Sequence, residues 1–218
     1  MIKHLSALLI LLTIICSCSD NTNDSNNVPY SDKYSGVTIH TSGPRGGGYT
    51  DSTGKIFGYR IFRTRVINDT IIPIELTIKF PIDSVVMLPK SHRHLRVFVI
   101  PDTLTPDTDK QYEYNYGVTE LKSFLKLAFN KSTMLKVTIQ PKQYNYIYLV
   151  VLCYPAPGLT NAKLFINGQD ENSAFIPIKS QKTIIKSGDK LDLLLGLRII
   201  DPPITYSLIP CGQIVFKN

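Results

Sequence analysis

The sequence predicts an all-β protein: an antiparallel β-sandwich of about nine or ten strands with one short inserted helix. The chain has 218 residues, of which 43% are hydrophobic and 19% charged, so it can bury a core and is not disordered throughout. Its 13 glycines and 14 prolines accompany many threonines, isoleucines, valines and tyrosines, which favours short strands and turns over long helices. Apolar segments recur between turn clusters at short intervals, which is typical of a sandwich or barrel.

The strands are predicted from alternation and from the turns that bound them. Within residues 73–80, for example, Ile74, Leu76 and Ile78 alternate with polar neighbours, as in a strand with one buried face. The predicted strands cover residues 37–41, 56–67, 73–80, 95–100, 135–139, 144–154, 163–166, 174–178, 191–199 and 213–216.

One helix is predicted where the apolar spacing becomes helical. Thr119-Glu120 opens the segment, apolar side chains recur at positions 121, 124, 125 and 128, and residues 130–133 close it.

A glycine-rich segment at residues 43–48 is followed by Gly54-Lys55, which suggests a comparison with phosphate-binding loops. Such a loop needs a lysine and then a hydroxyl residue at the start of a helix. Here Tyr49 and Ile56 stand where the motif needs other residues, and a strand follows. The segment is therefore predicted to be a flexible loop or hairpin, with an anion-binding nest that uses Arg45 as the alternative.

The first residues have the layout of a secretory signal peptide. Lys3 and His4 precede an apolar run of about eleven residues, which is too short to span a bilayer. The stretch Ile15-Cys16-Ser17-Cys18 resembles a bacterial lipobox, in which a small residue precedes the cysteine that is lipidated. Cys16 fits less well because bulky Ile15 precedes it, so Cys18 is the predicted lipid anchor. Ordinary cleavage or an uncleaved anchor is the alternative.

The segment after Cys18 is rich in Ser, Asp and Asn and has nothing to bury, so it is predicted to be a solvated tether. It also resembles the export signal of Bacteroidota surface lipoproteins. That resemblance implies an outer-membrane lipoprotein, with its domain on the periplasmic or the cell-surface side. The predicted organisation is a signal peptide at residues 1–17, a tether at 18–33 and one β-sandwich domain at 34–218.

Two further cysteines, Cys153 and Cys211, leave two alternatives open. In an exported protein they can form a disulfide, which would close a loop of nearly sixty residues and add about 4 kcal/mol of stability. Cys153 also lies in a strongly apolar run, where a buried thiol is equally expected.

Motifs for metal binding and catalysis are weak. His92 and His94 share one face of a strand, but Lys90, Arg93 and Arg96 surround them and no third ligand is near. An acidic loop could surround calcium but lacks the spacing of an EF-hand; its carboxylates are Asp102, Asp107, Asp109 and Glu113. The sequence therefore predicts no metal and no cofactor. The nucleophile and zinc-protease motifs are missing, so a non-enzymatic role is favoured.

Two sets of three tyrosines alternate along extended segments: Tyr112, Tyr114 and Tyr116, and Tyr144, Tyr146 and Tyr148. In each set the three rings share one face. The first set, together with Arg45, is the candidate ligand-contact surface, because tyrosine combines an apolar body with a polar tip. The alternative is packing within the sandwich, which is the prediction for the second set because an apolar run follows it.

Basic residues cluster at Arg60, Arg63 and Arg65, and at Lys90, Arg93 and Arg96. Nucleic acid is not expected as a partner of an exported lipoprotein. An anionic glycan, a lipid phosphate or an acidic protein surface could use these residues, and ordinary solvated faces are the alternative.

Four Asp-Ser or Asp-Thr pairs resemble the O-glycosylation sequon of exported Bacteroidota proteins, which makes candidates of Ser52, Thr70, Ser84 and Thr103. The alternative is turn chemistry, which also enriches such pairs.

Together these features predict a lipid-anchored, non-enzymatic binding or assembly module of the outer membrane, whose partner is an envelope protein or a glycan. The alternative is a hydrolase of envelope or environmental polysaccharide. That enzyme would need a cleft with two carboxylates about 5–10 Å apart.

Overall fold

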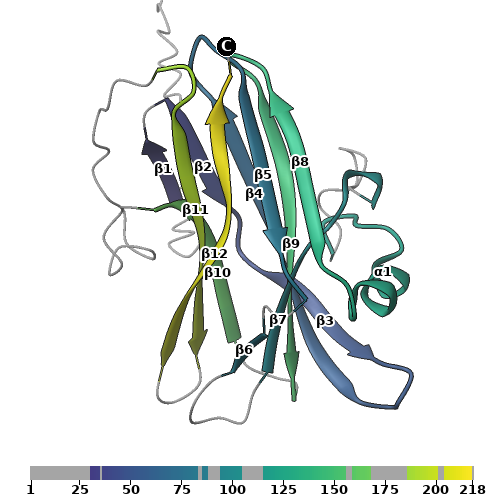
Figure 1. Cartoon of the computed structure of the whole chain (residues 1–218). Coiled ribbons are helices and arrows are strands. Elements are labelled where there is room, and N and C mark those ends of the chain that lie inside the picture. Colours follow the sequence, from purple (N-terminus) through teal and green to yellow (C-terminus); the bar gives the residue numbers. More distant parts are fainter. Residues whose placement is uncertain are drawn as a thin grey trace, which may run out of the picture.

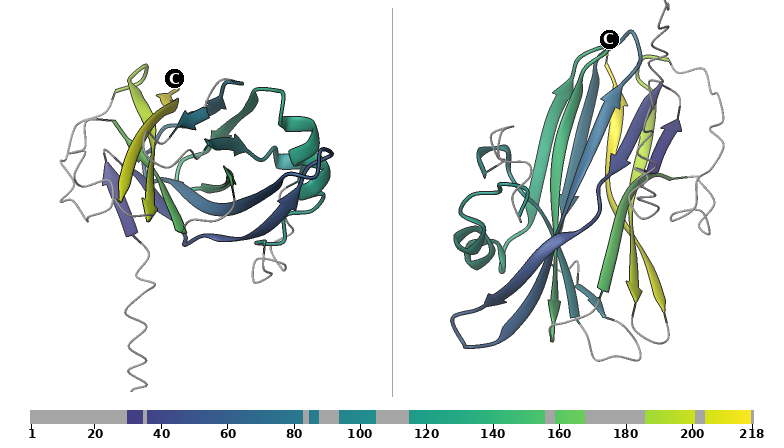
Figure 2. Two further views of the ribbon diagram at one scale, coloured as in Figure 1. Left: turned by 90° about the horizontal axis from the view of Figure 1, so that it is seen from below. Right: turned by 180° about the vertical axis from the view of Figure 1, so that it is seen from behind.

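The computed structural model describes residues 30–34, 36–82, 85–87, 94–104, 115–155, 159–167, 186–200 and 204–217. These residues form two antiparallel sheets and one α-helix, which confirms the predicted all-β sandwich (Figure 1). The long strands run along the length of the molecule, and the helix lies at one side (Figure 2).

The first sheet has the strand order β1-β2-β4-β9-β7-β6, and β3 also pairs with β4. Its members are β1 (Tyr30–Tyr34), β2 (Val37–Thr41), β3 (Arg45–Thr50), β4 (Ile56–Asn68), β6 (Val85–Met87), β7 (His94–Val99) and β9 (Tyr144–Tyr154).

The second sheet has the order β10-β11-β12-β5-β8. Its members are β5 (Ile74–Phe80), β8 (Thr133–Ile139), β10 (Leu159–Ile166), β11 (Lys190–Ile200) and β12 (Thr205–Phe216). A 3-10 turn, η1 (Asp102–Leu104), and the helix α1 (Leu121–Ala128) follow β7.

The main core lies between the two sheets, because each strand turns alternate side chains inward. On β4 these are Phe62 and Val66, and on β5 they are Ile74, Leu76 and Ile78, all fully buried. A second apolar cluster lies on the outer face of the first sheet, where α1 covers it with Leu121 and Leu125. The sandwich therefore has a covered outer face at the end that carries α1.

The described residues contain twelve strands, more than the nine or ten predicted. One addition is β1, whose first residues fall in the predicted tether and pair with β2 through main-chain hydrogen bonds. Another is β3, which forms a hairpin with β4, so of the predicted loop or hairpin at the glycine-rich segment the structure shows the hairpin. The last strand begins at Thr205 rather than residue 213. The predicted strand at 174–178 lies outside the described residues.

Glycine allows β3 to pair closely with β4. A Cβ at Gly46 would lie 2.0 Å from the main-chain oxygen of Tyr59, far inside contact distance. The same requirement occurs in the second sheet at Gly212, close to the irregularity in the pairing of β11 with β12. Both positions bring two backbones closer than any side chain would permit.

Asn68 joins three elements at the end of β4. Its buried amide donates to the carbonyls of Ile72 (2.9 Å) and Ile139 (3.0 Å), and its oxygen accepts from the main chain of Thr70 (3.0 Å). The side chain therefore ties the β4–β5 turn to the end of β8, across the two sheets.

Candidate functional site

The outer face of the first sheet carries the most distinctive side chains. On β4, alternation that buries Phe62 turns Arg63 and Arg65 outward. The neighbouring strand β9 is paired so that Arg63 lies opposite Tyr148 and Arg65 opposite Tyr146. The register therefore sets a row of arginines beside a row of tyrosines.

These side chains form one continuous stack, which we call the arginine–tyrosine ladder. Its six members, in order of contact, are Arg45, Tyr116, Arg63, Tyr146, Tyr144 and Arg65.

Each contact in the ladder falls within the range of a cation–π or aromatic pair. The guanidinium carbons of Arg45 and Arg63 lie 4.4 Å and 5.2 Å from the centroid of the Tyr116 ring. Arg63 also lies 5.0 Å from the ring of Tyr146, which meets Tyr144 edge to face at 5.5 Å. Arg65 closes the stack at 3.9 Å from the Tyr144 ring. The stacking on tyrosine rings holds each guanidinium group in place.

The ladder has a buried end and an open end. Tyr116 is only 4% exposed, and its hydroxyl donates to the carbonyl of Gly43. Burial raises the pKa of Tyr116, against the opposing effect of Arg45 and Arg63, so the phenol stays neutral. At the other end Tyr144 is 51% exposed. A ligand would therefore meet the ladder at Arg65 and Tyr144.

His40 of β2 is the cross-strand neighbour of Arg65. Burial lowers the pKa of this imidazole, the Arg65 charge lowers it further, and Asp69 acts in the opposite direction. The imidazole is therefore neutral at pH 7, and the positive charge at the open end comes from guanidinium groups.

The ladder corrects two predictions about the tyrosines. Tyr116 was expected at a ligand-contact surface, but it is buried and supports Arg45 and Arg63 instead. Tyr112 and Tyr114 lie outside the described residues. Of the second set, Tyr148 is buried as predicted, whereas Tyr144 is half exposed. Arg63 and Arg65 are spaced two residues apart, like the tyrosines, so the sequence indicates that both arginines share one face of a strand. That this face lies beside the tyrosines of β9 is known only from the register of β4 with β9.

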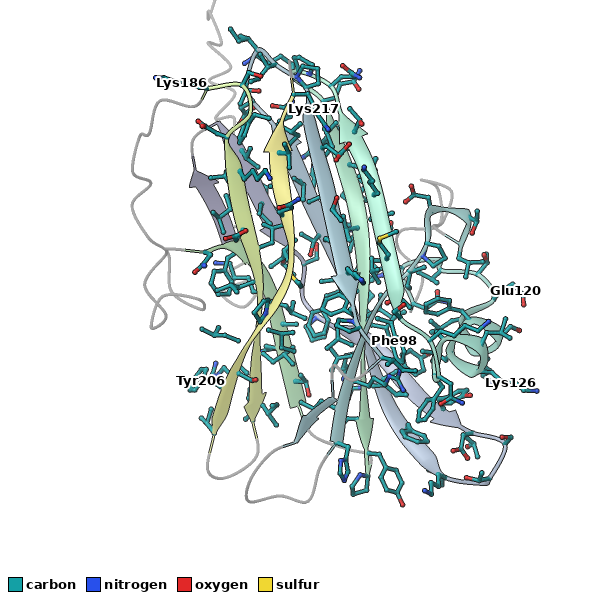
Figure 3. The ribbon with its side chains drawn as sticks, viewed as in Figure 1. Phe98, Glu120, Lys126, Lys186, Tyr206 and Lys217 are labelled. Atoms are coloured by element: carbon teal, nitrogen blue, oxygen red, sulfur yellow. The ribbon has the colours of Figure 1, made fainter. Side chains whose placement is uncertain are left out.

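The other predicted basic residues are dispersed. Arg60 points away from the ladder face and donates to the carbonyl of Tyr59. Arg96 is half buried and stacks on Phe98 and Phe129, 5.3 Å and 5.2 Å from their ring centroids. Figure 3 shows Phe98 beside α1, with Glu120 and Lys126 at the outer side of that helix. Lys90 and Arg93 lie outside the described residues.

A pocket of about 290 Å³ opens at the start of α1; it is lined by Tyr59, Asn115, Val118, Glu120, Leu121, Lys122 and Ser123. Its single carboxylate, Glu120, accepts a hydrogen bond from the Ser123 hydroxyl (3.1 Å). A glycoside hydrolase needs a second carboxylate across its cleft. This pocket does not have the pair of carboxylates that the hydrolase interpretation requires.

The metal candidates can be placed only in part. His94 is exposed at the start of β7, and Asp102 is exposed in η1. Their predicted companions His92, Asp107, Asp109 and Glu113 lie outside the described residues. Within the described ranges, no three His, Cys, Asp or Glu side chains gather closely enough to hold a metal ion.

Cys153 and Cys211 are buried thiols rather than a disulfide, so the second of the two alternatives holds. Cys153 belongs to β9 of the first sheet, with its sulfur 3.7 Å from the carbonyl oxygen of Pro155. Cys211 belongs to β12 of the second sheet and donates to the carbonyl of Leu193 (3.5 Å). Burial raises the pKa of the Cys211 thiol, which keeps it protonated and unreactive.

The candidate glycosylation sites differ in their surroundings. Ser52 and Thr103 are exposed, in the β3–β4 turn and in η1. The Thr70 hydroxyl lies 2.6 Å from the Asn68 oxygen and 2.8 Å from the carbonyl of Ile72, so it forms part of the turn. Ser84 lies outside the described residues. The turn alternative therefore accounts for Thr70.

One buried amine lies apart from the ladder. Lys163 of β10 is 5% exposed, and burial lowers its pKa from 10.5 to about 7. Between pH 7 and 10.5 Lys163 therefore binds a proton in the unfolded chain but not in the folded one, and its contribution to the free energy of unfolding rises with pH. Below about pH 7 both states are protonated, and the full cost of burying the ammonium remains.

We expect Lys163→Met to stabilise the protein at pH 7 by about 2 kcal/mol and to flatten the rise in stability with pH. Urea unfolding between pH 7 and 8 measures both effects, below the pH at which the Cys211 thiol titrates in the unfolded chain. The exposed Lys186→Met is the control and should leave the pH dependence as in the wild type. Equal pH slopes for wild type and Lys163→Met would contradict the prediction.

The sequence-level expectation of an anchored protein rests on the leader, which lies outside the described residues. Among the residues that the structure describes, no helix has the length and apolar character to cross a membrane. No protein-family model matches the chain, and no curated protein matches it either.

Proposed function

We propose that this protein is a lipid-anchored, non-enzymatic binding module of the outer membrane, whose arginine–tyrosine ladder binds an anionic glycan. The observation that carries the proposal is the ladder, in which three guanidinium groups are stacked on three tyrosine rings. Anchoring through Cys18 is supported by the lipobox-like leader, and the polar segment after it supports a tether.

The chemistry of the open end favours an anionic sugar polymer. A guanidinium fork binds carboxylate, sulfate or phosphate through paired hydrogen bonds. Arg63 and Arg65 are two residues apart on one strand, so their Cα atoms lie about 7 Å apart, a spacing suited to charges repeated along a chain. The half-exposed ring of Tyr144 offers an apolar surface to a sugar ring.

The proposal predicts that Arg65→Gln and Tyr144→Ala each weaken binding to an anionic polysaccharide by at least about fivefold. The full-length protein in mild detergent is titrated with polygalacturonate and with dextran sulfate, and neutral dextran serves as the ligand control. The matched variant is Arg198→Gln on β11 of the second sheet, a half-buried arginine outside the ladder. It removes the same charge and should leave the affinity unchanged.

Equal losses in Arg65→Gln and Arg198→Gln would mean that net charge alone attracts the polymer, and the ladder would not be the site. No binding of either polymer by the wild type would remove the glycan proposal. Release of reducing sugar ends during the titration would instead support the hydrolase alternative.

A further inference from the structure

The strand β3 forms one outer edge of the first sheet at the end that carries α1. Among the described strands β3 pairs only with β4, whereas the adjoining strand β2 is covered by β1. Figures 1 and 2 show the β3–β4 hairpin projecting from the body, with β3 on its outer side. An open edge of this kind offers main-chain donors and acceptors to another strand.

Alternation tells which residues face the open edge. The main-chain N–H of Asp51 donates to the carbonyl of Lys55 across the hairpin (3.0 Å), so the main-chain groups of Asp51 point toward β4. On an antiparallel strand the main-chain N–H and C=O groups of residues two apart point the same way, so those of Tyr49 and Gly47 point toward β4 as well. The N–H and C=O groups of Gly46, Gly48 and Thr50 therefore point outward.

The edge lacks the features that usually block strand addition. Within Arg45–Thr50 there is no proline and no lysine, and three consecutive residues are glycine. Gly48 is exposed, and a Cβ placed on it would meet nothing nearer than the Phe57 oxygen at 4.0 Å. Another backbone can approach this edge without displacing side chains at its centre.

The charges along the edge are complementary under a two-fold axis through Gly48. If a second β3 runs antiparallel with Gly48 opposite Gly48, then Gly46 lies opposite Thr50 and Arg45 lies opposite Asp51. All three hydrogen bonds to the Asp51 carboxylate end on Oδ1, from the N–H groups of Thr53 and Lys55 and from the Thr53 hydroxyl. Oδ2 accepts none of these three bonds, and the register sets the positive charge of Arg45, which stacks on Tyr116, opposite this carboxylate.

We propose that this chain pairs with a second copy of itself through the open edge of β3, centred on Gly48, so that the first sheets of two molecules become continuous. The outward-facing groups of the two strands supply about six main-chain hydrogen bonds, and two Arg45–Asp51 pairs flank them. This interface is separate from the open end of the ladder at Arg65 and Tyr144.

The test uses charge at the two-fold axis. Gly48→Lys places two lysines directly opposite each other in the pair, and Gly48→Glu places two glutamates there. Each variant alone should raise the dissociation constant of the dimer by at least about tenfold, measured by sedimentation equilibrium of the full-length protein in density-matched detergent. An equal mixture of the two should dimerise again, because lysine then lies opposite glutamate.

The matched control is Thr138→Lys, which adds the same charge at an exposed position of β8 in the second sheet and should dimerise like the wild type. A monomeric wild type at all concentrations up to about 1 mM overturns the proposal. So does a dimer that Gly48→Lys leaves intact, or a mixture of the charged variants that stays monomeric. Glycan titration of Gly48→Lys against Thr138→Lys, which carries the same added charge, keeps the two proposals apart, since loss of the dimer should leave the two variants with the same polysaccharide binding per chain.

Discussion

Replacing Gly212 by alanine is expected to lower the free energy of unfolding by about 3 kcal/mol or more. A Cβ at this position would lie 1.9 Å from the main-chain oxygen of Thr77 and 2.9 Å from its carbonyl carbon. Both atoms belong to the backbone of β5, so no side-chain rotation can relieve the clash. Relief requires β12 to separate from β5 where the two strands pair, near Gly212 and Ile78.

Urea unfolding followed by circular dichroism measures this loss. The control is Gly48→Ala, where the nearest atom to the new Cβ is 4.0 Å away and the change should be within about 0.5 kcal/mol. A Gly212→Ala protein as stable as Gly48→Ala would show that the two backbones are not in close contact at this point.

Replacing Asn68 by alanine is the second change for which we expect a large effect, also about 3 kcal/mol. The side chain is fully buried and makes two donor contacts and two acceptor contacts. Its removal leaves the buried carbonyl of Ile139 without this donor and the N–H of Thr70 without this acceptor. These polar groups then stay buried without the Asn68 side chain as a partner. Their desolvation penalty exceeds the net contribution that the lost hydrogen bonds made to the free energy of unfolding.

The same unfolding measurement tests Asn68→Ala, and Asn130→Ala is the matched control. Asn130 is exposed in the turn after α1, so its removal should change stability by less than about 0.5 kcal/mol. Similar small losses in both variants would contradict the role assigned to Asn68 in joining the β4–β5 turn to β8.

The local pattern of apolar and polar residues was sufficient to predict many of the strands and the helix. The predicted strand at 144–154 has the bounds of β9, and the predicted helix has the apolar positions that α1 buries. Alternation and helical spacing depend only on neighbouring residues, which is why they can be recognised in the chain alone. The same reasoning left residues 43–48 as a loop or a hairpin, because a glycine-rich segment has no side-chain pattern and the pairing of β3 depends on close approach to β4.

The candidate site required the tertiary structure. The sequence contains Arg63, Arg65 and two tyrosine sets, but only the register of β4 with β9 sets those arginines beside Tyr144 and Tyr146. Arg45 and Tyr116 were both candidates, yet the fold makes Tyr116 a buried support for Arg45 rather than an exposed contact.

The two cysteines show the same division. Their spacing allowed a disulfide or two thiols, and only the structure shows them as two separate buried thiols, on β9 and β12 of different sheets. Strand periodicity is a property of adjacent residues and is visible in the chain. The all-β class could therefore be predicted from the sequence. Sheet partners, register and burial arise from contacts between distant segments, so the ladder, the open edge of β3 and the buried Lys163 are known only from the fold.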